Sequence, residues 1–177
     1  METCSYFIEN KALFGGYPNH KQFEELINNK VVCFVDLITK AERDNLNVYD
    51  TSNIQYMNYD IKDRFIPEDI YKFIKFIHKI SLVINNLKDE DKIYIHCKGG
   101  HGRAGIIVSC LLCYLYKYSS DTSLELTNKY HNNRKTMKEK WRIVGSPQTD
   151  RQKEFIRRLF KPIYLDKIHL KNTYFPF

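Results

Sequence analysis

The stretch Lys92–Gly105, with the sequence KIYIHCKGGHGRAG, decides the fold of this chain. Its first five residues, Lys92–His96, are apolar at their centre and predict a buried strand. The three glycines that follow predict a turn, and an apolar helix is expected from about Arg103 to Tyr118. The stretch therefore indicates a strand, a turn and a helix in direct succession, which is the repeating unit of an α/β fold.

Further strands and helices alternate along the rest of the chain. Val31–Leu37 is a valine-rich run, as expected of a strand that is buried on both faces. Apolar residues recur at helical spacing between Ile70 and Ile84, which predicts a long helix that starts near Pro67. Other strands are expected at Phe7-Ile8, Leu13-Phe14 and Ile54–Tyr59, and other helices at Asn19–Asn29, Thr122–Asn132 and Thr149–Phe160. We predict an α/β fold, a single domain with a central, mostly parallel sheet of about four to five strands flanked by helices on both faces.

The length of the chain suits one domain. The 177 residues are enough to bury a hydrophobic core without disulfides, and we expect no division within 1–177. The core should span about residues 5–160, and the tail 161–177 should pack back on this body. Hydrophobic residues make up 43% of the chain, which excludes a disordered protein.

Targeting signals and cysteine usage restrict the cellular location. The longest mostly apolar run, Ile106–Leu115, is too short to span a bilayer, and Met1–Glu9 lacks the form of a secretory leader. The five cysteines are an odd number without paired zinc-type spacing, which argues against a secreted disulfide scaffold. Cys33, Cys110 and Cys113 are expected to be core residues. We therefore predict a reducing compartment, the cytoplasm.

The positive charge of the chain is concentrated in one segment. The chain has 28 Lys and Arg against 21 Asp and Glu, a formal charge of +7. Residues 134–161 contain ten basic and three acidic residues, so this segment alone equals the whole excess. Such a run is either a solvated helix face or a surface that meets anionic partners.

The turn after the strand has the composition of an anion-binding loop. Gly99, Gly100 and Gly102 permit unusual backbone angles, so that successive N–H groups can converge at the start of the helix. Arg103 adds a planar donor that can bind two phosphate oxygens at once. Cys97 comes first in this loop, where the same positive field should lower its thiol pKa from about 8.5 to roughly 3.5–7.5. The residues alone thus predict a cysteine thiolate beside a bound anion.

His96-Cys97, five intervening residues and Arg103 resemble the signature of the cysteine-dependent protein tyrosine phosphatases, and the short chain resembles their dual-specificity branch. The likeness covers most of the chain, from Gly15 to about Phe160, and the superfamily includes viral members. It implies hydrolysis of phosphomonoesters on phosphoprotein, with phosphotyrosine and also phosphoserine or phosphothreonine as targets, through a phosphocysteine intermediate. It implies no metal or cofactor, and for a viral member the nucleus of the host cell becomes a second location.

The resemblance also assigns roles within the loop. Cys97 is implied to attack phosphorus, and His96 to tune the thiolate through a hydrogen bond. Arg103 and the backbone N–H groups of the loop would bind the equatorial oxygens of the phosphoryl group. The implied substrate-binding residues are Lys98, Gly99, Gly100, His101, Gly102 and Arg103.

A general acid is expected on the loop that follows the strand ending near Tyr59. The resemblance favours Asp63, because Ile61-Lys62-Asp63 followed shortly by Pro67 is similar to the acid loop of the family. Asp60 and Asp69 are the alternatives, the first as a simple loop residue and the second as a charge in the first turn of the next helix.

A second catalytic loop is expected at Gly145-Ser146-Pro147-Gln148-Thr149. Gln148 resembles the glutamine that orients water for hydrolysis of phosphocysteine in the large tyrosine phosphatases, and Gln152 is the weaker candidate. The alternative is that the segment is only the start of a helix.

Ala104 departs from the family pattern. Family members usually have Ser or Thr directly after the Arg, where the hydroxyl helps the thiolate to leave in the second step. Ala104 therefore predicts slow breakdown of the intermediate, and it also favours an alternative in which the chain is a low-turnover phosphate-binding module.

The class of substrate stays open at this point. Lys98 and His101 occupy positions that are basic in the phosphoinositide phosphatases of the superfamily, so a phosphoinositide or inositol phosphate is the first alternative to phosphoprotein. RNA 5′ ends are a further alternative, which the presence of Asp63 counts against. We expect no DNA partner and no transmembrane segment.

Overall fold

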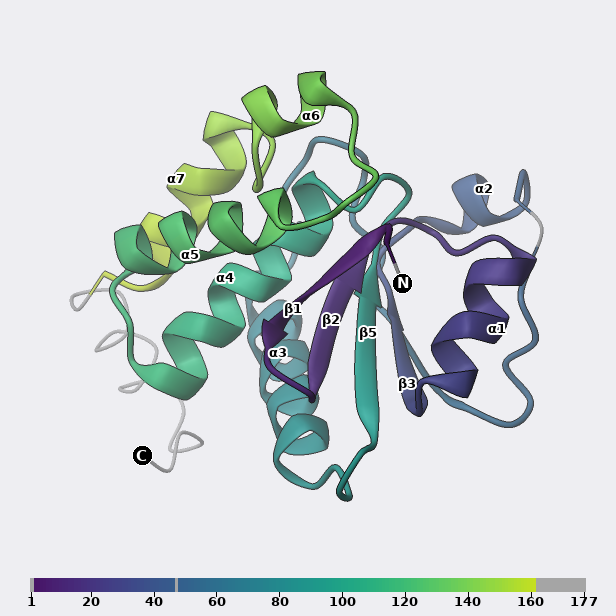
Figure 1. Ribbon diagram of the computed structural model, residues 1–177. Helices are drawn as coiled ribbons and strands as arrows, with labels where there is room; N and C mark the ends of the chain where they lie inside the picture. Colours follow the sequence, from purple (N-terminus) through teal and green to yellow (C-terminus); the bar gives the residue numbers. More distant parts are fainter. Residues whose placement is uncertain (1, 47, 162–177) are drawn as a thin grey trace.

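Figure 1 shows the computed structural model of the chain, which describes residues 2–46 and 48–161. Five strands form one sheet in the order β1-β2-β5-β3-β4. Strand β1 pairs with β2 in antiparallel direction, and all other neighbours are parallel. The strands are β1 (Cys4–Ile8), β2 (Ala12–Gly15), β3 (Val31–Asp36), β4 (Gln55–Asn58) and β5 (Lys92–His96). The predicted mostly parallel sheet is thus confirmed.

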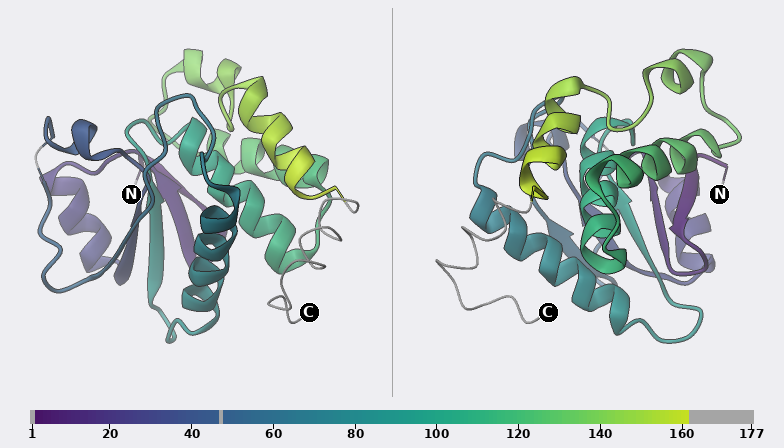
Figure 2. Two further views of the ribbon diagram at one scale, coloured as in Figure 1. Left: turned by 180° about the vertical axis from the view of Figure 1, so that it is seen from behind. Right: turned by 90° about the vertical axis from the view of Figure 1, so that its left-hand side faces the viewer.

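Helices cover both faces of this sheet, unequally. Helix α1 packs on β3 on one face, while α4 contacts β2 and β5 on the other face. Figure 2 shows α3, α5 and α7 arranged around α4 on that second face. The helices are α1 (His20–Asn28), α2 (Lys40–Arg43), α3 (Ile70–Asn85), α4 (Gly102–Tyr116), α5 (Ser120–Asn132), α6 (Glu139–Val144) and α7 (Asp150–Leu159).

The core follows the alternation of side chains along the strands. Ile93 and Ile95 of β5 belong to the cluster beneath α4, whereas Tyr94 between them belongs to the cluster beneath α1. Helix α4 is the centre of the larger cluster, since Gly102–Cys113 are all buried. A helix that is apolar all round is expected where other helices enclose it, and α3, α5 and α7 do so here.

Two short helices are absent from the sequence-based prediction. Helix α2 has four residues and α6 has six, which is too short to show a helical period. The predicted packing of the tail 161–177 concerns residues that, apart from Lys161, lie outside the described ones. Within residues 2–46 and 48–161, none of the helices has the length and apolar character needed to cross a membrane.

Candidate active site

The glycine-rich loop lies at the carboxyl edge of the parallel strands, between β5 and α4. His96, the last residue of β5, is in register with Gly15 of β2 on one side and with Asp36 of β3 on the other. The loop Cys97–His101 therefore starts at the centre of the sheet. In open α/β sheets this edge is where ligands bind.

Contacts with neighbouring segments hold the loop carbonyl groups away from its centre. The carbonyl oxygens of His96 and Lys98 accept hydrogen bonds from the backbone N–H groups of Leu37 (3.0 Å) and Tyr17 (3.1 Å). The His101 carbonyl accepts one from the Ser146 hydroxyl at 2.6 Å. Because C=O and N–H point in opposite directions in a trans peptide, the next N–H groups face the interior of the loop. The loop can therefore present several donors to one anion.

Glycine is required at Gly100. Its φ of +75° is unfavourable for other residues, and a Cβ atom there would lie 2.3 Å from the backbone carbon of Gly15. The end of β2 thus packs directly against the loop. This contact explains the glycine at position 100.

Cys97 is enclosed by the loop that it begins. The residue is 2% exposed, and its Sγ accepts a hydrogen bond from the backbone N–H of Gly100 at 3.2 Å. Helix α4 starts beside it without a side-chain cap on its first N–H groups. A buried helix N-terminus without a cap leaves its N–H groups available to a ligand, and it favours negative charge.

Arg103 lies in the first turn of α4 and is 1% exposed. Its Nη1 and Nη2 donate to the two carboxylate oxygens of Glu42 at 2.7 and 3.0 Å, and Nη1 also donates to the Ile61 carbonyl oxygen at 3.1 Å. Burial alone would lower its pKa, but the bond to Glu42 and the nearby Cys97 outweigh burial and raise it. Its buried Nε has no partner among the described residues. A donor is thus left over for a ligand, as a phosphate-binding arginine needs.

Glu42 is the site residue that sequence reasoning missed. It is in α2, and its Oε2 accepts from both the backbone N–H and the hydroxyl of Thr39 at 3.1 Å, as in a capping box. Burial raises its pKa, but the bond from Arg103 outweighs burial, so the pKa is lowered and the carboxylate stays charged. The sequence signal was Thr39-x-x-Glu42 directly after a buried strand, which predicts the helix start but not its partner.

Asp63 is the one of the three candidate acids that lies at Arg103. Its Oδ1 is 3.2 Å from Arg103 Nη2, and its side chain is 64% exposed. Asp60 instead forms an ion pair with Arg43 at 3.2 Å. Asp69 caps α3 by accepting a hydrogen bond from the Lys72 N–H at 2.9 Å. Asp60 and Asp69 thus make their contacts away from Arg103, and Asp63 is the candidate acid beside it.

Gln148 and Gln152 both approach the loop, in different ways. A Cβ atom built on Gly102 would lie 2.8 Å from the Gln152 amide oxygen and 3.3 Å from Gln148 Cβ. Gln152 is fully buried, caps α7 and donates to the Phe65 carbonyl oxygen at 3.0 Å. Gln148 is only partly buried. Of the two glutamines, Gln148 thus has the more exposed side chain.

His96 is fully buried beneath the loop. Its Nε2 is 2.6 Å from the Tyr49 hydroxyl, and its Nδ1 is 3.9 Å from Asp36 Oδ1. Burial lowers the pKa of His96 to about 4, so the ring is neutral at pH 7. No hydrogen bond joins this ring to Cys97 Sγ in the described part of the chain. His96 therefore does not stabilise the Cys97 thiolate through a positive charge on its ring.

The two variable positions of the loop differ in character. Lys98 is exposed. The His101 ring is stacked on Trp141 with 4.4 Å between ring centroids, and its Nδ1 is 2.8 Å from His131 Nε2. Burial, with a further contribution from Arg134, lowers the pKa of His101 to about 4. His101 therefore adds no positive charge to the loop at pH 7.

Three of the other four cysteines were predicted to be core residues, and the structure confirms this. Cys33, Cys110 and Cys113 are at most 4% exposed. Burial raises the pKa of Cys33 to about 12 and that of Cys113 to about 11. These thiols are poor nucleophiles, because the thiolate is the reactive form.

The basic segment 134–161 reaches the loop with some of its side chains only. Arg134 and Lys138 line a cavity next to Gly99, and Arg151 lies over the Phe65 ring beside the Asp63 loop. Others have structural tasks: Arg142 donates to backbone carbonyl groups, Arg157 pairs with Asp121, and Arg158 pairs with Glu154. Some basic side chains of segment 134–161 therefore lie near the site, while others form structural contacts away from it.

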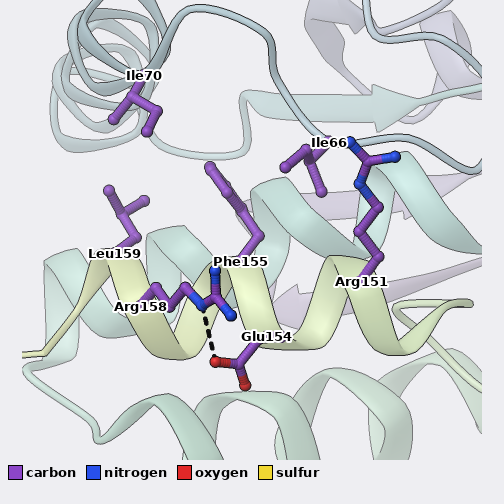
Figure 3. Close-up of a pocket in the computed structure, with 7 residues that line it drawn as sticks. All are labelled: Ile66, Ile70, Arg151, Glu154, Phe155, Arg158 and Leu159. Atoms are coloured by element: carbon purple, nitrogen blue, oxygen red, sulfur yellow. Dashed lines mark hydrogen bonds and ion pairs between the residues drawn. The ribbon is translucent and has the colours of Figure 1, made fainter.

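A larger cavity of about 530 Å³ lies between the segment after Asp63 and helix α7 (Figure 3). Apolar side chains from both elements face each other across it, and charged side chains of α7 stand at its edge. Its lining is Ile66, Ile70, Arg151, Glu154, Phe155, Arg158 and Leu159. The lining includes no residue of the Cys97 loop, so this cavity is separate from the anion site.

Comparison with known proteins agrees with this geometry. A family model described as "Swiss Army Knife protein, DSP-PTPase phosphatase domain" matches residues 14–156. The chain belongs to the DSP-PTPase phosphatase family. The match includes both Glu42 and the whole loop from Cys97 to Arg103.

Viral proteins are close relatives of this phosphatase-family chain. It is 36% identical over 161 residues to protein 067L of Invertebrate iridescent virus 3, and this match covers 90% of the chain and 66% of the relative. It is 36% identical over 182 residues to protein 197R of Invertebrate iridescent virus 6, with 98% and 63% covered. Both relatives are named as tyrosine phosphatases. The chain thus spans just under two thirds of the length of these curated relatives.

Solved structures of phosphatases share the fold. The crystal structure of Tk-PTP in the active form superposes with a TM-score of 0.70 at 18% identity, over 89% of this chain and 95% of that one. The likeness confirms the predicted α/β architecture of the phosphatase family.

Proposed function

We propose that this chain hydrolyses phosphomonoesters on phosphoproteins through a phosphocysteine intermediate at Cys97. The observation that carries the proposal is the arrangement of one loop. The buried Cys97 thiol lies at the uncapped N-terminus of α4, where Arg103 is held by Glu42 and keeps a donor without a partner. This combines a nucleophile with donors for the oxygens of a phosphoryl group. The five free cysteines support a reducing, cytoplasmic location for it.

In the first step the Cys97 thiolate attacks phosphorus. A bond forms between Sγ and phosphorus while the bond from phosphorus to the ester oxygen breaks. Asp63, placed 3.2 Å from Arg103, donates a proton to the leaving oxygen, so that an alcohol departs and not an alkoxide. Arg103 and the loop N–H groups bind the equatorial oxygens and stabilise the negative charge on them.

In the second step water hydrolyses the phosphocysteine. Gln148, which lies next to Gly102, orients the water, and the Asp63 carboxylate accepts its proton. The bond from phosphorus to Sγ breaks, and inorganic phosphate and the thiolate are released. The charges and protons balance without a metal or cofactor.

We expect Asp63→Asn to lower kcat on aryl phosphates by at least about tenfold, since general acids typically contribute about 10²–10⁴-fold. The loss should be larger for phenyl phosphate than for p-nitrophenyl phosphate, because the nitrophenolate leaves more readily without a proton. Asp60→Asn is the matched control, since Asp60 pairs with Arg43 and should show no such dependence on the leaving group. An equal, small effect on both substrates would remove Asp63 from the mechanism.

Ala104 leads to a prediction about the second step. Ala104 is fully buried directly after Arg103 and offers no hydroxyl to the departing thiolate. Breakdown of the intermediate should therefore limit the rate, with a burst of p-nitrophenol in stopped-flow measurements. Ala104→Ser should raise steady-state kcat severalfold and reduce the burst. A wild-type reaction without a burst, together with an unchanged kcat in the variant, would contradict this.

A panel of substrates tests the proposal that phosphoprotein is the substrate. Of the two loop positions that favoured a phosphoinositide, His101 contributes no positive charge, because its ring is neutral and packed on Trp141. We expect phosphotyrosine peptides to give the highest kcat/KM, ahead of phosphoserine peptides, inositol phosphates, phosphoinositides and triphosphate-ended RNA. A higher kcat/KM for a non-peptide substrate would overturn the assignment. Binding of these compounds without turnover of any would favour the phosphate-binding module.

A further inference from the structure

Helix α2, which carries Glu42, is too short to fix its own position. It has four residues, none of them buried, and such a short helix is marginal without contacts from outside. Its capping box closes the first turn, but the acceptor in that box is the same Glu42 carboxylate that binds Arg103. We therefore expect a further contact to fix α2 relative to the sheet.

Arg43, the last residue of α2, makes this contact with both terminal nitrogens of its guanidinium. Its Nη1 donates to Asp36 Oδ2 at 3.1 Å, and its Nη2 donates to Asp60 Oδ1 at 3.2 Å. Asp36 is the last residue of β3, and Asp60 lies between the end of β4 and Asp63. One side chain thus joins α2 to the ends of two neighbouring strands.

Two further hydrogen bonds strengthen this connection. The Tyr56 hydroxyl of β4 accepts from Arg43 Nη1 at 2.9 Å and donates to Asp36 Oδ2 at 2.6 Å. The second oxygen of Asp60 accepts from the backbone N–H of Lys40 at 3.3 Å. Because Lys40 is the first residue of α2 and Arg43 the last, Asp60 contacts both ends of the helix.

Asp36 is the buried end of the connection. Its side chain is 1% exposed, and its Oδ1 accepts from the backbone N–H of Ile38 at 2.9 Å. Within residues 2–46 and 48–161, Arg43 is the only charged cation that pairs with this carboxylate, since the His96 ring at 3.9 Å is neutral at pH 7. A buried carboxylate needs such a partner, so the end of an interior strand determines where Arg43 lies.

We propose that Arg43 is a positioning residue for Arg103 and that it acts through Glu42. The inference rests on the proposed function, in which Arg103 stabilises the charge of the transition state. Glu42 binds the guanidinium of Arg103, whereas Arg43, the next residue, binds the carboxylates at two strand ends. The strand ends therefore determine the position of α2, and α2 determines the orientation of the guanidinium that binds the phosphoryl oxygens.

Arg43→Lys tests this proposal. Lysine keeps the positive charge that Asp36 needs, so the chain should fold, but an ammonium lacks the planar fork that reaches Asp36 and Asp60 at once. We expect kcat for p-nitrophenyl phosphate to fall about fivefold, since a misplacement of about 1 Å can cost up to about 10²-fold. KM should stay nearly the same. The loss should be equal for phenyl phosphate, because the misplaced group is Arg103 and not the acid Asp63.

Arg157→Lys is the matched control. Arg157 of α7 forms a pair of the same kind with Asp121 of α5, at 2.7 Å, and neither residue contacts α2. This variant should keep the kcat of the wild-type chain. An equal loss of kcat in both variants would mean that the substitutions act through general stability, and it would overturn the inference. A lower melting temperature of Arg43→Lys at unchanged kcat would show that Arg43 serves only the fold, with the same consequence.

The double variant Glu42→Gln/Arg43→Lys tests the route of the effect. If Arg43 acts through Glu42, the double variant should have nearly the kcat of Glu42→Gln alone, because the group that Arg43 positions is already impaired. Additive losses would show that Arg43 influences the reaction by another route, and they would contradict the proposal.

An NMR signal of Arg103 separates this inference from the proposed function, because it needs no turnover. The Nε–H of Arg103 is buried, and its ¹⁵N-correlated signal can be assigned by its absence in Arg103→Lys. We expect a sharp signal in the wild-type chain and in Cys97→Ser, and a broadened one in Arg43→Lys, where the guanidinium exchanges between orientations.

The signal and the rates together decide between the two proposals. If the wild-type chain hydrolyses no phosphomonoester but the Arg103 signal broadens in Arg43→Lys and not in Arg157→Lys, the positioning role stands and the proposed catalysis fails. If hydrolysis depends on Cys97 while Arg43→Lys keeps the wild-type signal and kcat, the positioning role is wrong and the proposed function stands.

Discussion

The Cys97→Ser variant is expected to lose hydrolysis of p-nitrophenyl phosphate by at least about 10³-fold, because removal of the nucleophile in enzymes with covalent intermediates has effects of this order or larger. The serine hydroxyl has nearly the shape of the thiol but a much higher pKa, so it is not ionised at neutral pH. The anion site should remain, since its donors are backbone N–H groups and Arg103. We therefore expect inorganic phosphate to protect the variant against thermal unfolding as it does the wild-type chain.

Cys113→Ser provides the control for this substitution. Cys113 is also buried, on α4, but its thiol contacts Ser123 at 3.1 Å and lies outside the loop. It should keep most of the activity. Comparable activity in Cys97→Ser and Cys113→Ser would place the nucleophile elsewhere and remove the phosphocysteine intermediate. Loss of activity together with loss of phosphate protection would instead indicate that the loop had collapsed.

The features that the sequence predicted are local ones. Strand β5, the glycine turn and α4 follow each other without a gap, and each has its own signal in periodicity or composition. The position of Cys97 at the start of the loop and of Arg103 in the first turn of α4 follows from this order alone. The local pattern left Asp60, Asp63 and Asp69 open, and only the resemblance to the acid loop of the family favoured Asp63, which lies 3.2 Å from Arg103 in the structure.

The features that the sequence did not predict depend on segments that are far apart along the chain. Glu42 and Arg103 are 61 residues apart, and Thr39-x-x-Glu42 indicates a capping box irrespective of what the carboxylate binds. The cavity beside Gly99 combines residues as far apart in the sequence as Thr3 and Trp141, so no single motif describes it. His101 was expected to be a basic group, but its neighbours Trp141 and His131 enclose it and keep it neutral. Side-chain burial and contacts between distant segments depend on the tertiary structure, so a local sequence pattern does not predict them.

Arg103→Lys should lower kcat by about 10²–10³-fold, the usual effect of removing one donor to transition-state charge. Lysine keeps the positive charge, so the fold and the attraction for a dianion should persist. It cannot, however, bind both carboxylate oxygens of Glu42 and the phosphoryl oxygens at the same time, because an ammonium lacks the planar fork of the guanidinium. KM should therefore change much less than kcat. A large increase in KM at constant kcat would mean that Arg103 only binds the ground state.

Glu42→Gln tests whether Glu42 acts through Arg103. Glutamine keeps the shape of the side chain and one oxygen acceptor, but it loses the charge and one of the two bonds to the guanidinium, so kcat should fall by roughly tenfold. In the Arg103→Lys background the same substitution should have little further effect, because the group that Glu42 positions is already absent. Such non-additivity is the signature of two residues that act as a unit, and a double-mutant cycle measures it. Strictly additive losses would show that Glu42 contributes independently, for example by stabilising α2, and that Arg103 is oriented by the loop itself.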